Sequence, residues 1–305
     1  MALRIEALKI LQTLKHIVAG GLDVAYFDVG SPDGAPVVLL HGFPYDVHAY
    51  EEVTTRLSAK GRRCIVPYLR GYGPTRFRSP DTMRSGQQAA LGADLLALMD
   101  ALEMPSAVLA GYDWGGRAAC IVAALWPDRV RGLVTGGGYG IQDIARADLP
   151  VAPELEQLYW YQYYLHGERG RAGLQANRSA LCRLLWRQWS PTWAFDDAMF
   201  ARTAQAYDNP DFVDVVVHSY RHRFGLTAGD ARYDDLERRL AKQPRIPVPT
   251  IVLQGLADGV DPPQAQVDEH HHFLGSVETR LLGNVGHNLP QEAPAEFAEA
   301  VLDLT

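Results

Sequence analysis

The sequence has few cysteines and lacks both a long apolar run and a metal-binding pattern. Cys64, Cys120 and Cys182 are far apart, odd in number and match no zinc-ligand spacing, so neither a disulfide framework nor a metal cluster is expected. The run EHHHF at residues 269–273 places its histidines on different faces of a helix, so we expect no metal site there. No segment approaches the roughly 20 apolar residues of a membrane-spanning helix. These absences favour a reducing, cytoplasmic location and no membrane association.

Charge of one sign is not concentrated anywhere along the chain. The 305 residues include 29 Lys and Arg and 36 Asp and Glu, which gives a formal net charge of -7. Proteins that bind nucleic acid attract it through clustered basic residues. We therefore expect no nucleic-acid partner, while a homodimer is left open by the sequence.

The N-terminal stretch MALRIEALKILQTLKHI, residues 1–17, is apolar but interrupted by charges. Arg4, Glu6, Lys9 and Lys15 break every hydrophobic core that a targeting segment would need. The pattern predicts an amphipathic helix instead.

Short apolar runs alternate with longer segments of helical spacing. The runs expected to form strands are residues 22–30, 36–40, 63–68, 106–111, 130–137, 249–255 and 277–283. The segments expected to form helices are residues 83–104, 117–127 and 293–304. This alternation predicts an α/β fold with a mostly parallel, doubly wound sheet flanked by helices.

Residues 138–246 do not show the strand pattern. This stretch is rich in aromatic and charged residues, and Pro- and Gly-containing turns separate segments of helical character. A helical insertion between strands is typical of a cap over the carboxyl edge of a sheet, where ligands bind. We therefore predict a core of residues 1–137 and 247–305 and a helical cap domain of residues 138–246.

Asp113 stands at the centre of the motif GYDWGG, residues 111–116. The spacing G-x-Asp-x-G, after a strand and before a helix, is that of the nucleophile elbow, in which small flanking residues allow a sharp turn to expose the central side chain. Alone, the motif also fits an ordinary glycine turn with a solvated aspartate. The next motifs along the chain favour the elbow.

Three further loops follow predicted strands in the order that an elbow requires. HGFP, residues 41–44, can offer the Phe43 N–H as an oxyanion donor together with the N–H of Trp114. Asp258 and His287 then follow the last two strands. The chain order is nucleophile, acid and histidine.

At these residues the sequence resembles the α/β-hydrolase superfamily over nearly its whole length. The aspartate at position 113 is similar to that of the branch containing epoxide hydrolases, haloalkane dehalogenases and fluoroacetate dehalogenases. A carboxylate can displace a leaving group at a saturated carbon and leave an ester on the enzyme. Attack on an ester carbonyl would instead form a high-energy anhydride, so esterase activity is disfavoured.

The resemblance implies roles for the histidine and its acid. His287 is expected to activate the water that hydrolyses the ester on Asp113, and Asp258 to orient and stabilise the imidazole. Asp258 is preferred to the competing Asp261 because its spacing from Gly255 matches the usual position in the family.

The resemblance to epoxide hydrolases extends into the predicted cap. Those enzymes polarise the epoxide oxygen with two cap tyrosines, and Tyr161 in WYQYY and Tyr220 in HSYRHR match the two positions. Simple packing of these rings is the alternative. We expect Trp114 and Phe43, together with the two tyrosines, to bind the substrate. The aromatic cap also contains a set of tryptophans, which favours an apolar or aromatic epoxide: Trp160, Trp186, Trp189 and Trp193.

Two dehalogenase alternatives remain open. Haloalkane dehalogenases commonly hold halide with an Asn where this chain has Phe43 and with a Trp that Trp114 matches. Fluoroacetate dehalogenases hold a substrate carboxylate with an Arg directly after the nucleophile, where Trp114 stands, and a second Arg that Arg117 matches. Arg117 is therefore either a surface helix residue or part of an anion site.

Fold alone does not fix function, so a non-catalytic ligand sensor is a third hypothesis. The sequence predicts a cofactor-independent epoxide hydrolase that acts on a small molecule.

Overall fold

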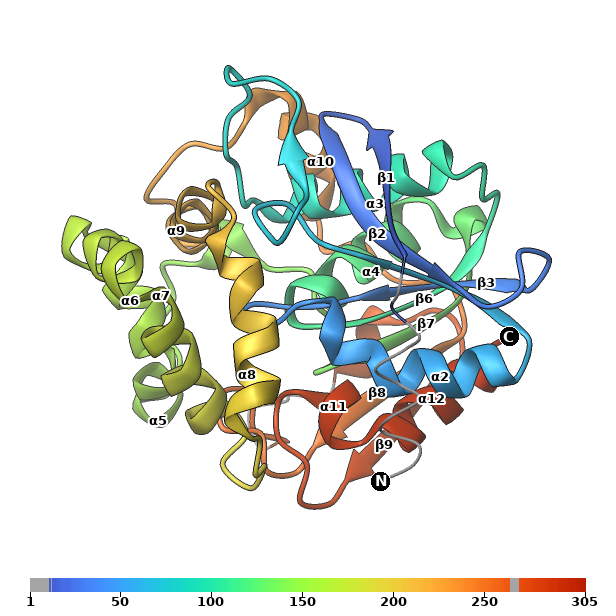
Figure 1. The fold of residues 1–305 in the computed structure, drawn as a ribbon. Coiled ribbons are helices and arrows are strands. Elements are labelled where there is room, and N and C mark those ends of the chain that lie inside the picture. The colour runs from blue at the N-terminus through green and yellow to red at the C-terminus, as the bar shows by residue number, and fades with distance from the viewer. Residues whose placement is uncertain (1–10, 12, 264–268) are drawn as a thin grey trace.

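A nine-stranded sheet forms the centre of the molecule, whose computed structural model describes residues 11, 13–263 and 269–305 (Figure 1). The strands are β1 (Leu14–Ala19), β2 (Leu22–Val29), β3 (Ala35–Leu40), β4 (Arg62–Pro67), β5 (Arg76–Phe77), β6 (Ala107–Tyr112), β7 (Val130–Gly136), β8 (Thr250–Gly255) and β9 (Val277–Leu282). Their order is β1-β2-β4-β3-β6-β7-β8-β9, and β5 pairs with β2. The strands from β4 to β9 in this order run parallel, whereas β1, β2 and β5 pair antiparallel. The predicted fold class is therefore confirmed.

Helices cover both faces of the sheet. On one side lie α2 (Glu51–Ala59), α11 (Leu289–Glu292) and α12 (Pro294–Leu302) (Figure 1). On the other lie α3 (Gln88–Ala101) and α4 (Asp113–Leu125), which pack against each other. Every residue of the central strand β6 is buried, as expected for a parallel strand covered on both faces.

All named elements between β7 and β8 are helical, in a stretch that the structure describes without a gap; we call residues 137–249 the insertion. Its α-helices are α5 (Pro153–Glu156), α6 (Trp160–His166), α7 (Glu168–Trp189), α8 (Asp197–Ala204), α9 (Phe212–His222) and α10 (Asp234–Leu240). Figure 1 shows α6 to α9 together at one edge of the sheet and α10 apart from them, near α3. Glu237 of α10 accepts a hydrogen bond from the Ala89 N–H of α3 at 3.1 Å. The division into core and cap at residues 138–246 stays a prediction.

The insertion is fastened to the loop after β3. The carbonyl oxygen of Pro44 accepts hydrogen bonds from the indole N–H of Trp186 at 2.8 Å and from the hydroxyl of Tyr207 at 2.5 Å. Both aromatic side chains are fully buried. The backbone of the HGFP loop is therefore held in place from the insertion side.

The helix predicted over residues 1–17 is wrong where the structure describes the chain. Leu14–Ala19 forms strand β1, which pairs with β2 in a hairpin from Leu14 and Phe27 to Ala19 and Leu22. Gly20 makes the tight turn at a positive φ of 56°. Residues 1–10 and 12 of the predicted helix lie outside the described residues.

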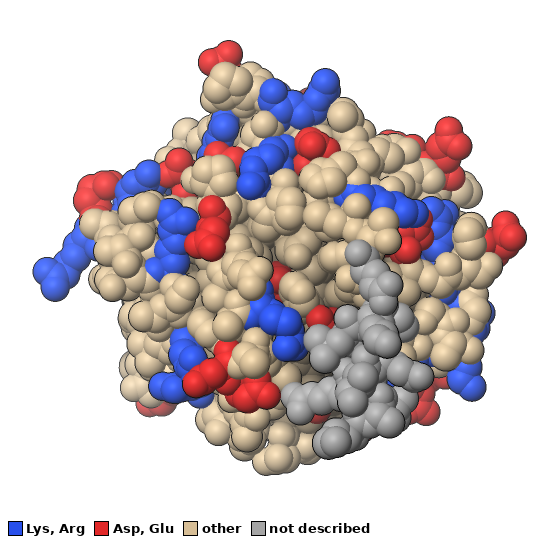
Figure 2. Space-filling model, in the orientation of Figure 1, with Lys and Arg blue, Asp and Glu red and all other residues tan. Residues whose placement is uncertain are grey.

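The described surface offers no concentration of one charge on the face seen in Figure 2. Lysine and arginine side chains are interspersed there with aspartate and glutamate. Within the described chain, every helix is too short or too polar to cross a bilayer.

Candidate active site

Asp113 occupies the sharp turn between β6 and α4. Its φ is +50°, a left-handed value that is uncommon outside glycine and is associated with strained functional turns. A Cβ atom at Gly115 would lie 2.0 Å from the Leu40 carbonyl oxygen, and one at Gly111 would lie 2.6 Å from the Gly115 carbonyl carbon. Only glycine fits at these two positions, so the local structure is that of the nucleophile elbow.

Two backbone N–H groups converge on one oxygen of Asp113. Phe43 donates to Oδ1 at 2.7 Å and Trp114 donates to the same oxygen at 2.6 Å. These are the two donors that the sequence pairs as an oxyanion hole. The arrangement is suited to stabilising negative charge on Oδ1 while leaving Oδ2 for other contacts.

His41 supports the donor loop and has both ring nitrogens engaged. Leu69 N–H donates to Nε2 at 3.1 Å, so Nδ1 carries the proton that it donates to the Gly42 carbonyl at 3.0 Å. Complete burial lowers the pKa of His41 to about 4. His41 is therefore a neutral structural residue.

His287 lies between two carboxylates. Its Nδ1 is 2.7 Å from Asp258 Oδ2, and its Nε2 is 3.8 Å from Asp113 Oδ2, longer than a direct hydrogen bond. Asp258 Oδ1 accepts the backbone N–H groups of Val260 and Asp261 at 2.9 Å each. The structure thus brings Asp113, His287 and Asp258 together, and Asp261 supports Asp258 through its backbone.

The charges of the site shift both titrating groups toward their ionised forms. Burial opposes ionisation of Asp113, but His287, Arg117 and the Phe43 N–H together hold the pKa of Asp113 below its ordinary value. Burial likewise opposes protonation of His287, but Asp258 and Asp113 raise the pKa of His287 well above its ordinary value. Asp113 is therefore a carboxylate at neutral pH, as a nucleophile must be.

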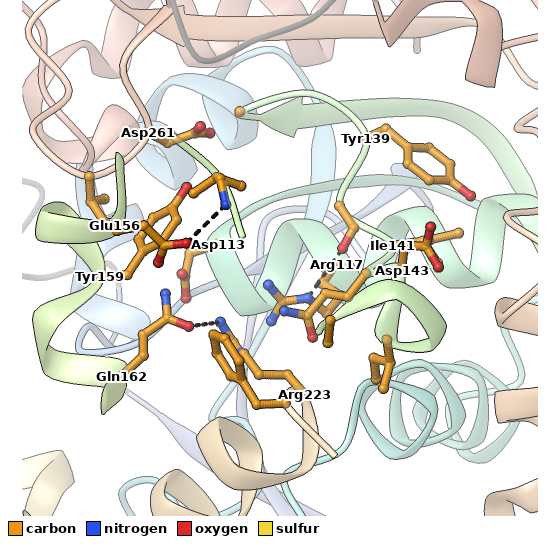
Figure 3. A pocket seen from close by; sticks show the side chains of 18 of the residues that line it. Asp113, Arg117, Tyr139, Ile141, Asp143, Glu156, Tyr159, Gln162, Arg223 and Asp261 are labelled. Carbon is orange, nitrogen blue, oxygen red and sulfur yellow. Dashed lines mark hydrogen bonds between the residues drawn. The ribbon is translucent and has the colours of Figure 1, made fainter. Parts of the chain in front are cut away.

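A cavity of about 770 Å³ opens onto the Asp113 side chain (Figure 3). The core contributes Asp113, Arg117 and His287 to its walls, and the insertion contributes aromatic, aliphatic and polar side chains. Examples from the insertion are Ile141, Tyr159, Tyr161, Gln162, Arg223 and Phe224. Asp113 thus lies on the wall of a pocket of small-molecule size.

The two predicted cap tyrosines differ in their positions. Tyr161 lines the cavity, and its hydroxyl oxygen accepts a hydrogen bond from the Gln162 amide at 3.1 Å. Tyr220 is fully buried and packs its ring 5.3 Å from that of Tyr161 and 5.5 Å from that of Phe43. Burial raises the pKa of both phenols, which keeps them protonated as hydrogen-bond donors. The two tyrosines are therefore adjacent, but only Tyr161 lines this cavity.

The four tryptophans of the insertion do not form the cavity wall among the described residues. Trp186 and Trp189 are fully buried, and Trp186 stacks on Trp193 at 5.3 Å between ring centroids. Trp160 donates its indole N–H to Gln188. These tryptophans pack the insertion.

Comparison with known proteins places the chain in a family. Residues 35–294, the greater part of the chain, match the α/β-hydrolase fold family. The chain belongs to this family.

Similarity to epoxide hydrolases spans nearly all of this α/β-hydrolase. It is 25% identical to an epoxide hydrolase of Caballeronia sordidicola over 94% of this chain and 91% of the relative, and 26% identical to epoxide hydrolase A of Mycobacterium tuberculosis over 95% and 96%. A crystal structure of a proposed epoxide hydrolase from Klebsiella pneumoniae is 48% identical, with a TM-score of 0.94 over 97% of this chain and 98% of that one. A haloalkane dehalogenase of Mycolicibacterium paratuberculosis is 32% identical, but over only 39% of this chain and 38% of the relative. The protein is a hydrolase enzyme.

Arg223 is a residue of the cavity wall that the sequence motifs did not indicate. Arg223 lies three residues beyond Tyr220, just past the end of α9, and its Nη1 donates to Gln162 Oε1 at 3.3 Å. Its Cζ is 4.4 Å from the centroid of the Tyr220 ring. Its spacing of three residues from Tyr220 in HSYRHR could have indicated Arg223 as a neighbour of that tyrosine, because residues three apart share a helix face.

Proposed function

We propose that this hydrolase is an epoxide hydrolase that converts an epoxide to a vicinal diol through a covalent ester on Asp113. The proposal rests mainly on one observation, which is that the two oxygens of Asp113 have different contacts. Oδ1 is bound by the Phe43 and Trp114 N–H groups, whereas Oδ2 faces His287 at 3.8 Å. The full-length similarity to epoxide hydrolases supports the same reaction.

In the first step Asp113 Oδ2 attacks an epoxide carbon from the cavity. A C–O bond forms to the carboxylate as the ring C–O bond breaks, and the ring oxygen becomes an alkoxide. Tyr161 donates a hydrogen bond to that oxygen and supplies its proton, with Tyr220 beside it. The outcome is a hydroxyalkyl ester on the enzyme.

In the second step His287 removes a proton from a water molecule that attacks the Asp113 carbonyl carbon. The charge that develops on Oδ1 is stabilised by the two backbone N–H groups already directed at it. Asp258 holds the imidazole and stabilises its cation. Collapse breaks the bond between the Asp113 carbonyl carbon and the substrate oxygen, and the second proton of the water passes to that oxygen, which releases the diol and restores the carboxylate. The proton on His287 returns through solvent to the Tyr161 phenolate, so that one water is added overall.

Formation of the ester also prepares His287 to act as a base. In the free enzyme the Asp113 carboxylate is one of the two groups that raise the pKa of His287. The ester carries no charge, so the pKa of His287 falls when the substrate becomes attached. The base thus becomes available when water must be activated.

We propose an apolar or aromatic body for the substrate. Tyr159, Tyr161 and Phe224 supply rings to the cavity wall, and Ile141 and Val260 supply aliphatic surface. The cavity volume of about 770 Å³ suits a small molecule of drug-like size.

One observation favours the dehalogenase alternative. The indole Nε1 of Trp114 is buried and has no hydrogen-bond acceptor among the described residues. Such a donor could hold a departing halide. However, Phe43 stands where haloalkane dehalogenases commonly have Asn, and its ring stacks on Trp114 at 5.8 Å. A halide would therefore have only one side-chain donor there, which ranks this function second.

Product analysis separates these functions. We expect a styrene-type epoxide to yield diol, and a bromoalkane to yield little bromide. Bromide release without diol formation would instead establish the dehalogenase. In the variant His287→Gln the ester should accumulate, visible as added mass on the peptide containing Asp113. Tight reversible binding with no adduct from either substrate class would support the ligand sensor.

A further inference from the structure

Two arginine side chains lie on the cavity wall without an ion-pair partner. Across the described residues, neither Arg117 nor Arg223 has a carboxylate oxygen within 4.0 Å, whereas most other partly buried arginines of the chain are paired. Arg117 uses Nε to bond the Gly140 carbonyl at 3.2 Å. Arg223 uses Nη1 to bond Gln162, and its buried Nε and Nη2 find no acceptor in the described part of the chain.

The two guanidinium groups belong to one local environment. Arg117 belongs to the N-terminal part of α4 and Arg223 directly follows α9, and Figure 3 shows both in the same region of the cavity near Asp113. Burial and then the nearby Arg223 charge lower the pKa of Arg117 to about 10. A guanidinium group ordinarily stays charged in a protein, so the cavity holds two like charges from different parts of the chain.

Bringing two cations together away from water is unfavourable unless an anion accompanies them. Arg117 helps to hold the pKa of Asp113 low, which accounts for part of its role. Arg223 contacts two neutral groups, the Gln162 amide and the ring of Tyr220, so no carboxylate among the described residues balances its charge at close range. A free anion in the cavity would interact favourably with both arginines.

We propose that the natural substrate carries a carboxylate that binds between Arg117 and Arg223, so that the enzyme opens epoxy acids in preference to neutral epoxides. This inference rests on the proposed function for its reaction and adds the class of substrate. A guanidinium matches a carboxylate geometrically through paired N–H donors. A single negative charge suits the cavity better than a doubly charged phosphate, because Asp143, Glu156 and Asp261 also lie on its wall.

The test compares terminal epoxy acids of increasing chain length with their primary amides. For the best chain length, we expect kcat/KM of the acid to exceed that of the amide about tenfold to a hundredfold, as hydrogen bonds to charged groups contribute. Arg223→Gln should reduce this ratio towards one, mainly through KM, and Arg117→Gln should reduce it as well. Arg223→Lys should retain part of the preference because it keeps the charge.

Arg221→Gln is the matched control. Arg221 lies on α9, pairs with the exposed Glu168 and is not part of the cavity wall. This variant should leave the acid-to-amide ratio at the wild-type value. A ratio near one in the wild-type enzyme, with the amides turned over, would overturn the carboxylate site while the epoxide hydrolase function stands.

Binding without turnover provides the second arm. Calorimetric titration with hexanoate and with hexanamide should show that hexanoate binds more tightly, and that Arg223→Gln weakens hexanoate binding about tenfold or more. If hexanoate binds in this way but no epoxide is turned over, the anion site would be supported and the proposed function would be rejected. Equal binding of the two probes would reject the anion site whatever the activity.

Discussion

The Ser190 hydroxyl donates a hydrogen bond to the Glu292 carboxylate at 2.6 Å and so links the insertion to the loop that carries His287. The same hydroxyl oxygen accepts the backbone N–H of His287 at 3.0 Å. Glu292 also accepts the N–H groups of Gly286 and Asn288, on either side of the histidine. Insertion and core thus share one network that fixes the position of the proposed base.

Ser190→Ala should therefore destabilise the fold and disturb the base together. Loss of a buried hydrogen bond to a charged group costs about 1.5–3 kcal/mol of unfolding free energy. Denaturant unfolding measures this loss, and kcat should also fall because His287 is less well positioned. Ser58→Ala removes only a local bond to the Thr55 carbonyl and serves as the control, with a change within about 0.5 kcal/mol. Equal effects of the two substitutions would contradict the role of the network.

The pH dependence of the reaction should report the charge on Asp113. Because Asp258 and Asp113 raise the pKa of His287, the free enzyme holds an imidazolium that loses its proton only above the ordinary histidine range. The raised pKa also means that protonated His287 stabilises the folded protein. This contribution to the free energy of unfolding is fully present below the pKa of His287 in the unfolded chain, and it is lost as pH rises through the pKa of His287 in the folded protein.

Asp113→Asn mimics the neutral ester and should lower the pKa of His287, as measured by NMR titration. In single-turnover experiments the rate of ester hydrolysis should correspondingly fall only at a pH below the pKa of His287 in the free enzyme. The control Asp148→Asn removes an exposed carboxylate from the cavity rim and should shift this pKa little. An unchanged His287 pKa in Asp113→Asn would contradict the proposed preparation of the base.

Tyr161→Phe should slow epoxide opening more than it slows bromide displacement, because only the alkoxide needs a proton. Loss of a positioned proton donor reduces the rate about a hundredfold or more. Tyr220→Phe should have the same selectivity but a smaller effect, since Tyr220 does not line the cavity. Tyr164→Phe on the same helix as Tyr161 is the control, because Tyr164 is not part of the cavity wall. If Tyr161→Phe slowed both reactions equally, Tyr161 would contribute only through packing and not as a proton donor.

Gly115→Ala should distort the elbow. The added Cβ would lie 2.0 Å from the Leu40 carbonyl oxygen, so strand or helix must move. Overpacking against a rigid backbone predicts a loss of about 3 kcal/mol or more in unfolding free energy. Gly283→Ala has open space around its Cβ and should change stability by less than about 1 kcal/mol. Similar unfolding midpoints for the two variants would show that the elbow tolerates a side chain.

The features that sequence predicted well are those encoded locally. The glycines around Asp113 act through a turn of a few residues, and buried parallel strands such as β6 appear as continuous apolar runs. The loop that carries Asp258 follows the fully buried strand β8, and the loop that carries His287 follows the edge strand β9, which pairs parallel with β8. Their meeting at one edge is a consequence of parallel topology.

Features that depend on distant partners were not predicted. β1 is an edge strand with mostly exposed residues, so its sequence lacks a buried-strand pattern and only pairing with β2 determines its conformation. The importance of Arg223 likewise arises only when α9 places it in a cavity with Arg117. No spacing in the sequence encodes that proximity.

The hydrogen bonds from Phe43 and Trp114 distinguish the two oxygens of Asp113. If Oδ1 never leaves these donors, every turnover consumes the oxygen at the other position and solvent replaces it there. In heavy-oxygen water the first diol would contain an oxygen from the protein, and each later diol one that an earlier cycle deposited. After many cycles the Asp113 peptide would contain a single heavy atom, and a doubly labelled peptide would reveal that the carboxylate rotates between cycles.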